Sequence, residues 1–192
     1  MTRLEVLFCV GSLAIVLLIG FLALLNHGVF RTRIECAQRL HTCQISMAGF
    51  AHDHAGHYPL EPWNGQPMNA AVHFQAFSNY LYVPWLVCPN DNRLPALSWE
   101  SLDNTNISYF INRAASPAKP SAVLLGDRNL LFEKAPNGSG FFKARWNSQA
   151  GLHGEFGNLI FVDGHLERKS PSSRLAEIAT QQMDSQSEWL VP

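Results

Sequence analysis

The run VLFCVGSLAIVLLIGFLALL, residues 6–25, decides how this chain is organised. It contains no Asp, Glu, Lys or Arg. As a helix it would extend about 30 Å, which matches the hydrocarbon core of a bilayer. A helix buried in a soluble core is the weaker interpretation, because the run is apolar on every face. A cleavable secretory signal has a shorter apolar region and a small-residue cleavage site. The run therefore predicts a membrane anchor that is retained.

Charged residues flank this run on both sides. Arg3 precedes it, and Arg31, Arg33 and Arg39 follow it, so the distribution of positive charge does not fix the orientation. Glu5 lies at the mouth of the apolar run, where a carboxylate needs a partner or the headgroup region. It either lies among the headgroups or neutralises the terminal amine of a neighbouring chain in an assembly.

The helical pattern continues beyond the apolar run as one stripe of an amphipathic helix. Spacings of three and four residues separate its members, which are Cys36, Leu40, Cys43, Met47 and Phe50. The polar residues expected to lie largely off this stripe are Arg33, Arg39, Gln44 and His52.

The end of this helix is predicted near His54 to His57. Gly56 can adopt the left-handed conformation that caps a helix, and Pro59 prevents its continuation.

Short extended runs follow in the remainder of the chain. Strands are expected at residues 107–112, 123–127, 141–146, 158–162 and 165–168. Asp163-Gly164 between the last two predicts a hairpin with a type I′ turn. The economical architecture is α+β, with a long N-terminal helix packed on a small antiparallel sheet. Residues 1–30 are the predicted anchor, and residues 31–192 are one globular domain that includes the second half of the helix.

Charge argues against a nucleic-acid partner. The chain has 14 Lys and Arg against 15 Asp and Glu, for a formal net charge of −1. It also lacks a basic stripe interleaved with aromatic residues.

The N-terminal sequence Met1 to Leu7 resembles the mature start of type IV pilins and type II secretion pseudopilins. Those proteins have Thr at position two, Glu at position five and then a long apolar helix. Arg3 departs from the pattern, because that position is usually apolar. Family members also carry a basic leader that is cleaved before this start, so the resemblance assigns Met1 and Glu5 to processing and assembly.

A second resemblance lies near the C-terminal end. His153, nine intervening residues and Asp163-Gly164 match the motif of prepilin-type proteins called H-X9-DG, and Asn158 and His165 fit the same pattern. Further positions similar to that family, in order, are Cys36, Leu40, Phe50, Asp53, Gly56, Tyr58, Pro59, Cys88, Pro89, Asn90, Asp91, Ser108, Tyr109, Asn112, Pro120 and Ser121.

These resemblances imply a bacterial pseudopilin-like subunit with a pilin-like fold and no enzymatic activity. Such a subunit polymerises through its N-terminal helix with itself or with other pseudopilins of a type II secretion system or type IV pilus-like assembly. It crosses the inner membrane once, and its C-terminal domain lies in the periplasm. The alternatives are an anchored binding domain that does not polymerise and an anchored metal-dependent hydrolase. The chain has no nucleophile elbow, H-E-x-x-H helix or phosphate loop to favour the hydrolase.

The H-X9-DG residues favour a structural role. Asp163 and Gly164 suit a turn, and His153 is expected to hydrogen-bond a nearby carbonyl or the Asp163 carboxylate. A metal site formed by His153, Asp163 and His165 is the alternative.

No cofactor is predicted, although two other segments contain potential metal ligands. The segment 52–57 is dense in His and Asp, and Asp91 and Asp103 with nearby Asn side chains offer oxygen ligands for calcium.

The cysteines limit which disulfides can form. Cys9 lies in the apolar run and is expected to be unpaired. Cys36 and Cys43 are seven residues apart, roughly 10.5 Å along a helix, whereas disulfide-bonded Cα atoms lie within about 7 Å. Cys88 is thus the available partner for either, and three reduced thiols are the alternative. The family resemblance favours Cys36–Cys88, and an oxidising compartment favours its formation.

Overall fold

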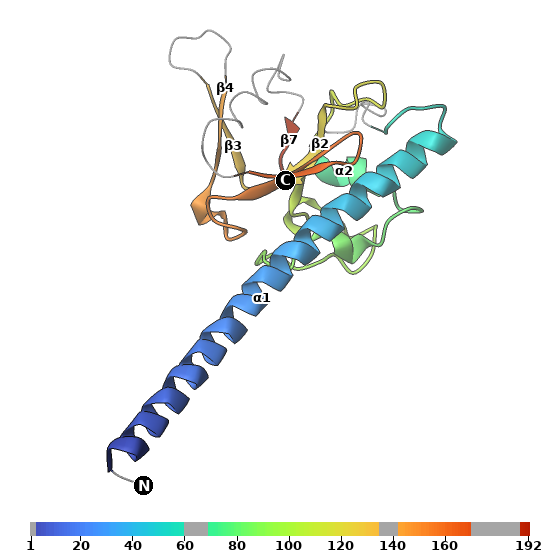
Figure 1. Cartoon of the computed structure of the whole chain (residues 1–192). Coiled ribbons are helices and arrows are strands. Elements are labelled where there is room, and N and C mark those ends of the chain that lie inside the picture. Colours follow the sequence, from blue (N-terminus) through green and yellow to red (C-terminus); the bar gives the residue numbers. More distant parts are fainter. Residues whose placement is uncertain (1–2, 60–68, 135–141, 170–188) are drawn as a thin grey trace.

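The computed structural model describes residues 3–59, 69–134, 142–169 and 189–192. At some of these positions, including 4–7, 9–10 and 23–30, it describes the backbone alone. The described residues form an α+β structure, as predicted: one long helix packs against an antiparallel sheet (Figure 1).

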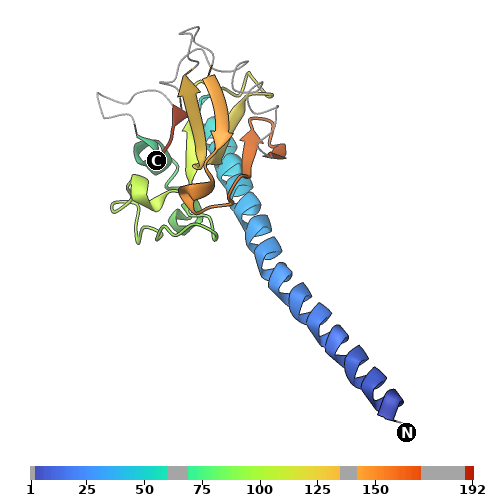
Figure 2. The ribbon, with the colours of Figure 1, turned by 90° about the vertical axis from the view of Figure 1, so that its left-hand side faces the viewer.

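Helix α1 runs without interruption from Arg3 to Asp53. Its first half extends away from the rest of the molecule, and its second half lies against the sheet (Figures 1 and 2). The backbone N–H of Gly56 donates to the carbonyl of Ala51 at 2.8 Å, and Gly56 has a φ of +82°. Gly56 therefore has the predicted left-handed conformation, but Ala55 before it also has a positive φ, of 55°, and the last helical residue is Asp53.

A search of the described part of the chain finds no helix both long and apolar enough to cross a membrane.

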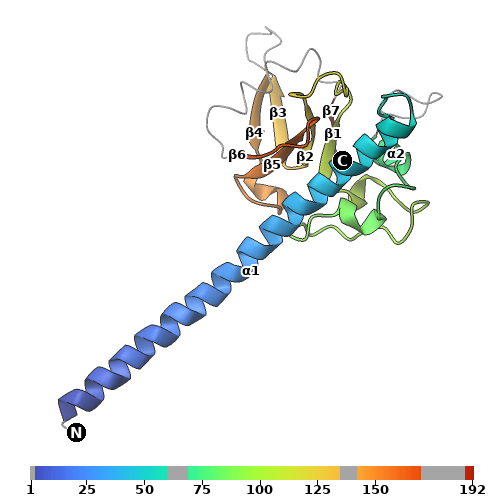
Figure 3. The same cartoon turned by 45° about the vertical axis from the view of Figure 1, so that its right-hand side comes forward.

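The main sheet contains five antiparallel strands in the order β6-β5-β2-β1-β7 (Figure 3). The strands that form it are β1 (Tyr109–Asn112), β2 (Val123–Asp127), β5 (Gly157–Phe161), β6 (Leu166–Lys169) and β7 (Trp189–Leu190). Strands β3 (Leu130–Lys134) and β4 (Phe142–Trp146) form a separate two-stranded sheet. The sequence predicted β2 with its observed bounds and placed β1, β4, β5 and β6 within two residues, but it did not predict β3 or β7.

Within the described ranges, four short helices connect these elements. They are α2 (Ala70–Gln75) and the 3₁₀ turns η1 (Val83–Leu86), η2 (Asn104–Asn106) and η3 (Ser148–Ala150). Asn69 caps α2 by accepting a hydrogen bond from the backbone of Val72. Asp103 caps η2 through the backbone of Thr105.

The predicted apolar stripe of α1 forms one wall of the core. Cys36, Leu40, Cys43 and Met47 are buried against the sheet, and Phe50 is partly buried at the edge of the same cluster. The placement of Gln44 off this stripe was wrong. Its side chain is buried because its Nε2 donates to the carbonyl of Val162 at 3.0 Å, which satisfies the amide inside the domain.

The β5–β6 hairpin is present, but its turn is not type I′. A type I′ turn needs positive φ at both central residues, and here Gly164 has a φ of +87° whereas Asp163 is not in that region. Gly164 N–H donates to the Phe161 carbonyl, and Phe161 N–H donates to the His165 carbonyl, both at 3.0 Å. This pattern corresponds to a three-residue loop with glycine in the left-handed position.

Candidate functional site: a buried cysteine and histidine cluster

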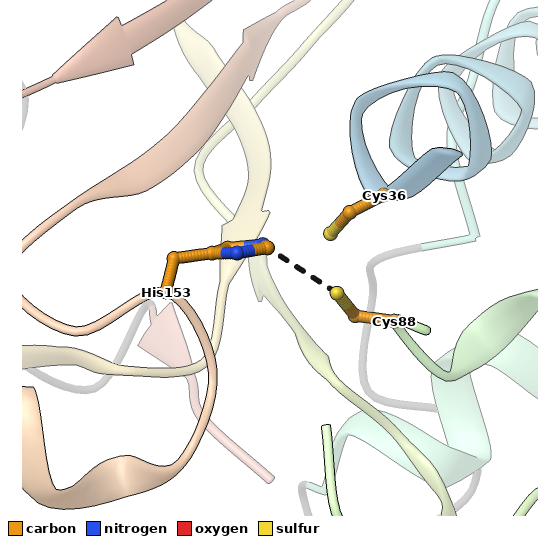
Figure 4. A group of neighbouring side chains, drawn as sticks. All are labelled: Cys36, Cys88 and His153. Atoms are coloured by element: carbon orange, nitrogen blue, oxygen red, sulfur yellow. Dashed lines mark hydrogen bonds between the residues drawn. The ribbon is translucent and has the colours of Figure 1, made fainter. Parts of the chain in front are cut away.

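Three side chains from distant parts of the sequence converge beneath the sheet. Cys36 comes from the buried stripe of α1, Cys88 follows η1, and His153 lies in the loop before β5. Their ligand atoms all lie within 4.8 Å of one another, and all three residues are buried. Figure 4 shows the two sulfur atoms and the imidazole edge pointing toward a common centre.

Local hydrogen bonds position Cys88 and His153. The backbone N–H of Cys88 donates to Ser108 Oγ at 2.9 Å, which fixes this segment against the start of β1. Asn90 Nδ2 donates to the carbonyl of Leu152 and so ties the cysteine loop to the histidine loop. As a result, His153 Nε2 lies 3.4 Å from Cys88 Sγ.

Asp127, the last residue of β2, borders the cluster and is fully buried. Its Oδ1 accepts from Cys36 Sγ at 3.4 Å, and its Oδ2 lies 3.7 Å from His153 Nε2. Asn158 on the adjacent strand β5 donates to Oδ2 from its backbone N–H at 2.7 Å and from its side chain at 2.9 Å. The cluster therefore contains two sulfurs, one imidazole and one carboxylate in a site closed to bulk water.

Burial and hydrogen bonding shift the pKa values of the two thiols in opposite directions. A hydrogen bond from Cys36, outweighing burial and aided by His153, lowers the pKa of Cys88 to about 7. Burial and the neighbouring Cys88 and Asp127 raise the pKa of Cys36 far above its ordinary value. Cys88 is therefore the thiol that ionises more readily.

The two remaining members of the cluster influence each other. Burial alone would lower the pKa of His153, but its hydrogen bond with Cys88 and the charge of Asp127 outweigh burial and raise this pKa. Burial raises the pKa of Asp127, and His153 and Asn158 offset only part of that increase. His153 thus has its acidic partner in Asp127, not in the Asp163 carboxylate named from the sequence.

The other H-X9-DG residues divide between two places. Asn158 belongs to the cluster, whereas Asp163 and His165 are exposed in the β5–β6 turn. Asp163 Oδ1 accepts from the backbone N–H of His165 at 3.0 Å and also contacts its imidazole. The structure therefore does not bring Asp163 and His165 together with His153, which removes the metal site drawn from those three residues.

Cys36 rather than Cys43 is the helix cysteine beside Cys88, although all three are free thiols in this structure. Cys43 is buried at another point of the stripe, and burial raises its pKa to about 12. The Cys36–Cys88 disulfide stays a prediction, because the sulfur atoms are neighbours without being bonded.

The remaining predicted site residues lie elsewhere. Met1 is outside the described residues, and Glu5 is described only as backbone of α1. In the two segments considered as metal sites, the carboxylates already accept hydrogen bonds from the protein. Arg128 donates to Asp91, Thr105 donates to Asp103, and Tyr80 donates to Asp53. Within the described ranges, the cysteine and histidine cluster is the one group of three closely spaced His, Cys, Asp or Glu ligands.

The sequence indicated Cys36, Cys88, His153 and Asn158 as separate site residues, but it did not predict that they form one cluster. Asp127 was predicted only as the last residue of a strand, not as a site residue. The available signal was the acid that closes the otherwise apolar run Val123–Gly126, because an ionisable group there must be buried with partners.

Neither a family model, nor a curated protein, nor a solved structure matches the chain.

Proposed function

We propose that this protein is a pseudopilin-like structural subunit of a type II secretion or type IV pilus-like assembly. Its N-terminal helix inserts in the inner membrane and packs against neighbouring subunits, and its C-terminal domain lies on the periplasmic side. The observation that carries this proposal is the exposed apolar half of α1, which projects away from the folded domain (Figure 2).

The exposure of this half-helix is extensive. Leu13, Leu17, Ile19 and Phe21 each expose about 60% of their surface or more within this single chain, and Phe8 exposes 77%. Leaving apolar surface in water costs about 25 cal/mol for each Å². Contiguous apolar surface of this kind marks contact with a membrane or a protein. The sequence continues the apolar run from Val6 to Leu25, which favours a membrane.

The second half of α1 supports a subunit with a rigid connection to its anchor. Its buried stripe packs against β2, β5 and η1, so the helix and the domain form one body. Arg39 reinforces this contact by donating to the carbonyl of Val87 at 2.6 Å. A helix held in this way can transmit packing between membrane helices to the domains outside.

A surface groove beside α1 favours polymerisation over a solitary anchored domain. Its volume is about 730 Å³, and it is lined by the outward-facing residues of α1 between Ile34 and Thr42 together with Trp85 and Leu166. Ile34 and Trp85 are exposed there and offer apolar contact to a neighbouring subunit. Cys36, Cys88 and His153 are buried, which supports a structural rather than an enzymatic role.

Glu5 provides the test of assembly. In the proposed filament its carboxylate compensates a neighbour's terminal ammonium at low dielectric, where an unpaired charge is expensive. Membranes that carry wild-type or Glu5→Ala protein would be cross-linked and the multimer ladders compared. We expect the ladder to be lost in Glu5→Ala, with membrane insertion unchanged.

Ser12→Ala is the matched control, because Ser12 is another polar residue of the same half-helix and bonds only within it, to the Phe8 carbonyl. It should keep the ladder. Equal ladders for wild type and Glu5→Ala would overturn the proposed assembly and leave an anchored domain.

A further inference from the structure

The buried cluster has the composition of a site for a transition metal. Cysteine sulfur and histidine nitrogen are the ligands that zinc prefers, and four such ligands in a tetrahedron complete a structural zinc site. Cys36, Cys88 and His153 supply three of these ligands. The Asp127 carboxylate lies beside two of them, Oδ1 at Cys36 and Oδ2 at His153, and is the group offered for the fourth position, although only the other three lie within 4.8 Å of one another.

The spacing of the ligand atoms fits a tetrahedral ion. Zinc bonds of about 2.3 Å to sulfur and about 2.0 Å to nitrogen or oxygen place a sulfur about 3.5 Å from a nitrogen or oxygen ligand. Cys88 Sγ lies 3.4 Å from His153 Nε2, and Cys36 Sγ lies 3.4 Å from Asp127 Oδ1. Two pairs of ligand atoms therefore have this spacing, and the ligand atoms of Cys36, Cys88 and His153 all lie within 4.8 Å of one another.

The surroundings of the cluster also fit a metal better than a disulfide. A disulfide needs no imidazole or carboxylate beside it, whereas this cluster buries both next to its two sulfur atoms. Asn158 holds Asp127 through two hydrogen bonds to Oδ2, which leaves Oδ1 directed at Cys36. A second shell that orients a ligating carboxylate in this way is typical of metal sites.

We propose that Cys36, Cys88, His153 and Asp127 bind one Zn²⁺ ion that fastens helix α1 to the globular domain. Binding displaces the thiol protons of Cys36 and Cys88 to solvent, and no oxidation or reduction occurs. The ligands come from α1, the segment after η1, the end of β2 and the loop before β5, so a single ion joins four parts of the domain.

The reduced thiols required for this site and the predicted Cys36–Cys88 disulfide exclude each other. The experiment therefore begins with full-length protein from its own membranes, extracted in detergent without added oxidant. Metal analysis should find one zinc per chain, and thiol counting should find Cys36 and Cys88 unoxidised.

Substitutions then locate the ion. Cys88→Ser and His153→Ala should lose the zinc, whereas Cys43→Ser should retain it. Cys43 is the matched control, because it is a buried thiol of the same helix stripe outside the cluster. His153→Cys should restore zinc, since it replaces one ligand with another and a purely structural histidine would not be rescued in this way.

Two measurements on the wild-type protein keep the proposal testable if a variant fails to fold. Removal of zinc with a chelator should lower Tm by roughly 5–10 °C, as expected for loss of a ligand present at about 100 times its Kd. Replacement by Co²⁺ should give the charge-transfer absorption of thiolate ligands. A Cys36–Cys88 disulfide in the protein from its membranes would overturn the proposal. Substoichiometric zinc, or zinc content unchanged by Cys88→Ser, would overturn it as well.

Discussion

Asp91 connects three segments of the domain through one buried carboxylate. Arg128 donates to both of its oxygens, from Nε at 2.8 Å and from the terminal guanidinium nitrogen at 2.7 Å. Ser108 Oγ donates at 2.7 Å, and the backbone N–H of Arg93 donates at 3.3 Å. Charge-assisted bidentate pairs of this kind are among the stronger hydrogen bonds in proteins. Asp91 therefore joins the segment after Cys88 to the start of β1 and the end of β2.

Asp91 should make the stability of the domain depend on acid pH. Burial would raise the pKa of Asp91, but its hydrogen bonds with Arg128 and Ser108 outweigh burial and lower this pKa. The unfolded chain, with an Asp pKa of about 3.9, therefore binds this proton more readily than the native protein. The resulting stability is complete above about pH 4 and is lost as pH falls through the lower native pKa.

Asp91→Asn tests this contribution. We expect it to lower the free energy of unfolding by about 3 kcal/mol at pH 7, because it removes one partner of a buried ion pair. The difference from wild type should shrink as the pH is lowered from 5 to 2 in denaturant titrations. A difference that stays constant over this range would show that the Asp91 charge makes no contribution.

The elements differ in how far the sequence could predict them. The α1 stripe was predictable because its spacing follows the helical repeat, and β2 because an apolar run ends sharply at Asp127. Strand β7 was missed because it is two residues long and exists only by pairing with β1. Strand β3 was missed because only Arg128 and Asn129 separate it from β2, with no strong turn signal between them.

The candidate site shows the same limit. Each ligand was visible as a residue type, but periodicity reports local structure, whereas Cys88 and His153 are 65 positions apart in the sequence and meet only in the fold. Gln44 illustrates the point in reverse. Because Gln44 is polar, the sequence predicted that it would lie off the buried stripe. In the fold it is buried, because its side chain donates a hydrogen bond to the carbonyl of Val162.

The β5–β6 hairpin depends on the conformation of Gly164. Its φ of +87° is unfavourable for residues with a Cβ atom. Gly164→Ala should lower the free energy of unfolding by about 1–2 kcal/mol. Gly164→Asn should cost less, since Asn tolerates this region. Thermal or urea unfolding would measure both.

Gly49→Ala is the matched control for this substitution. Gly49 lies within α1, and an added Cβ would meet only Tyr80 at an ordinary 3.5 Å. It should be neutral or stabilise the protein by up to about 1 kcal/mol. If alanine were tolerated equally well at positions 164 and 49, the left-handed glycine would not be what shapes the turn.

The whole molecule divides into a projecting apolar half-helix and a folded domain whose buried apolar residues form two clusters. The buried part of α1 begins at Cys36, and Phe8 and residues 11–22 are exposed, so the core does not require them. A chain beginning at Arg31 should therefore keep the Tm of the domain and leave the membrane fraction. The full chain should remain with membranes after carbonate extraction.

Leu17→Arg tests whether the half-helix enters the hydrocarbon core. Leu17 lies near the middle of the apolar run, where an Arg costs about 3 kcal/mol relative to Leu on the scale measured for membrane insertion. We expect the variant to shift markedly from the carbonate-resistant to the extractable fraction while the domain keeps its Tm.

Gln38→Arg introduces the same charge at an exposed position of the domain half of α1 and should remain membrane-bound. If Leu17→Arg stayed fully carbonate-resistant, or if the wild-type chain were recovered without detergent as a soluble monomer, the half-helix would not be a membrane anchor.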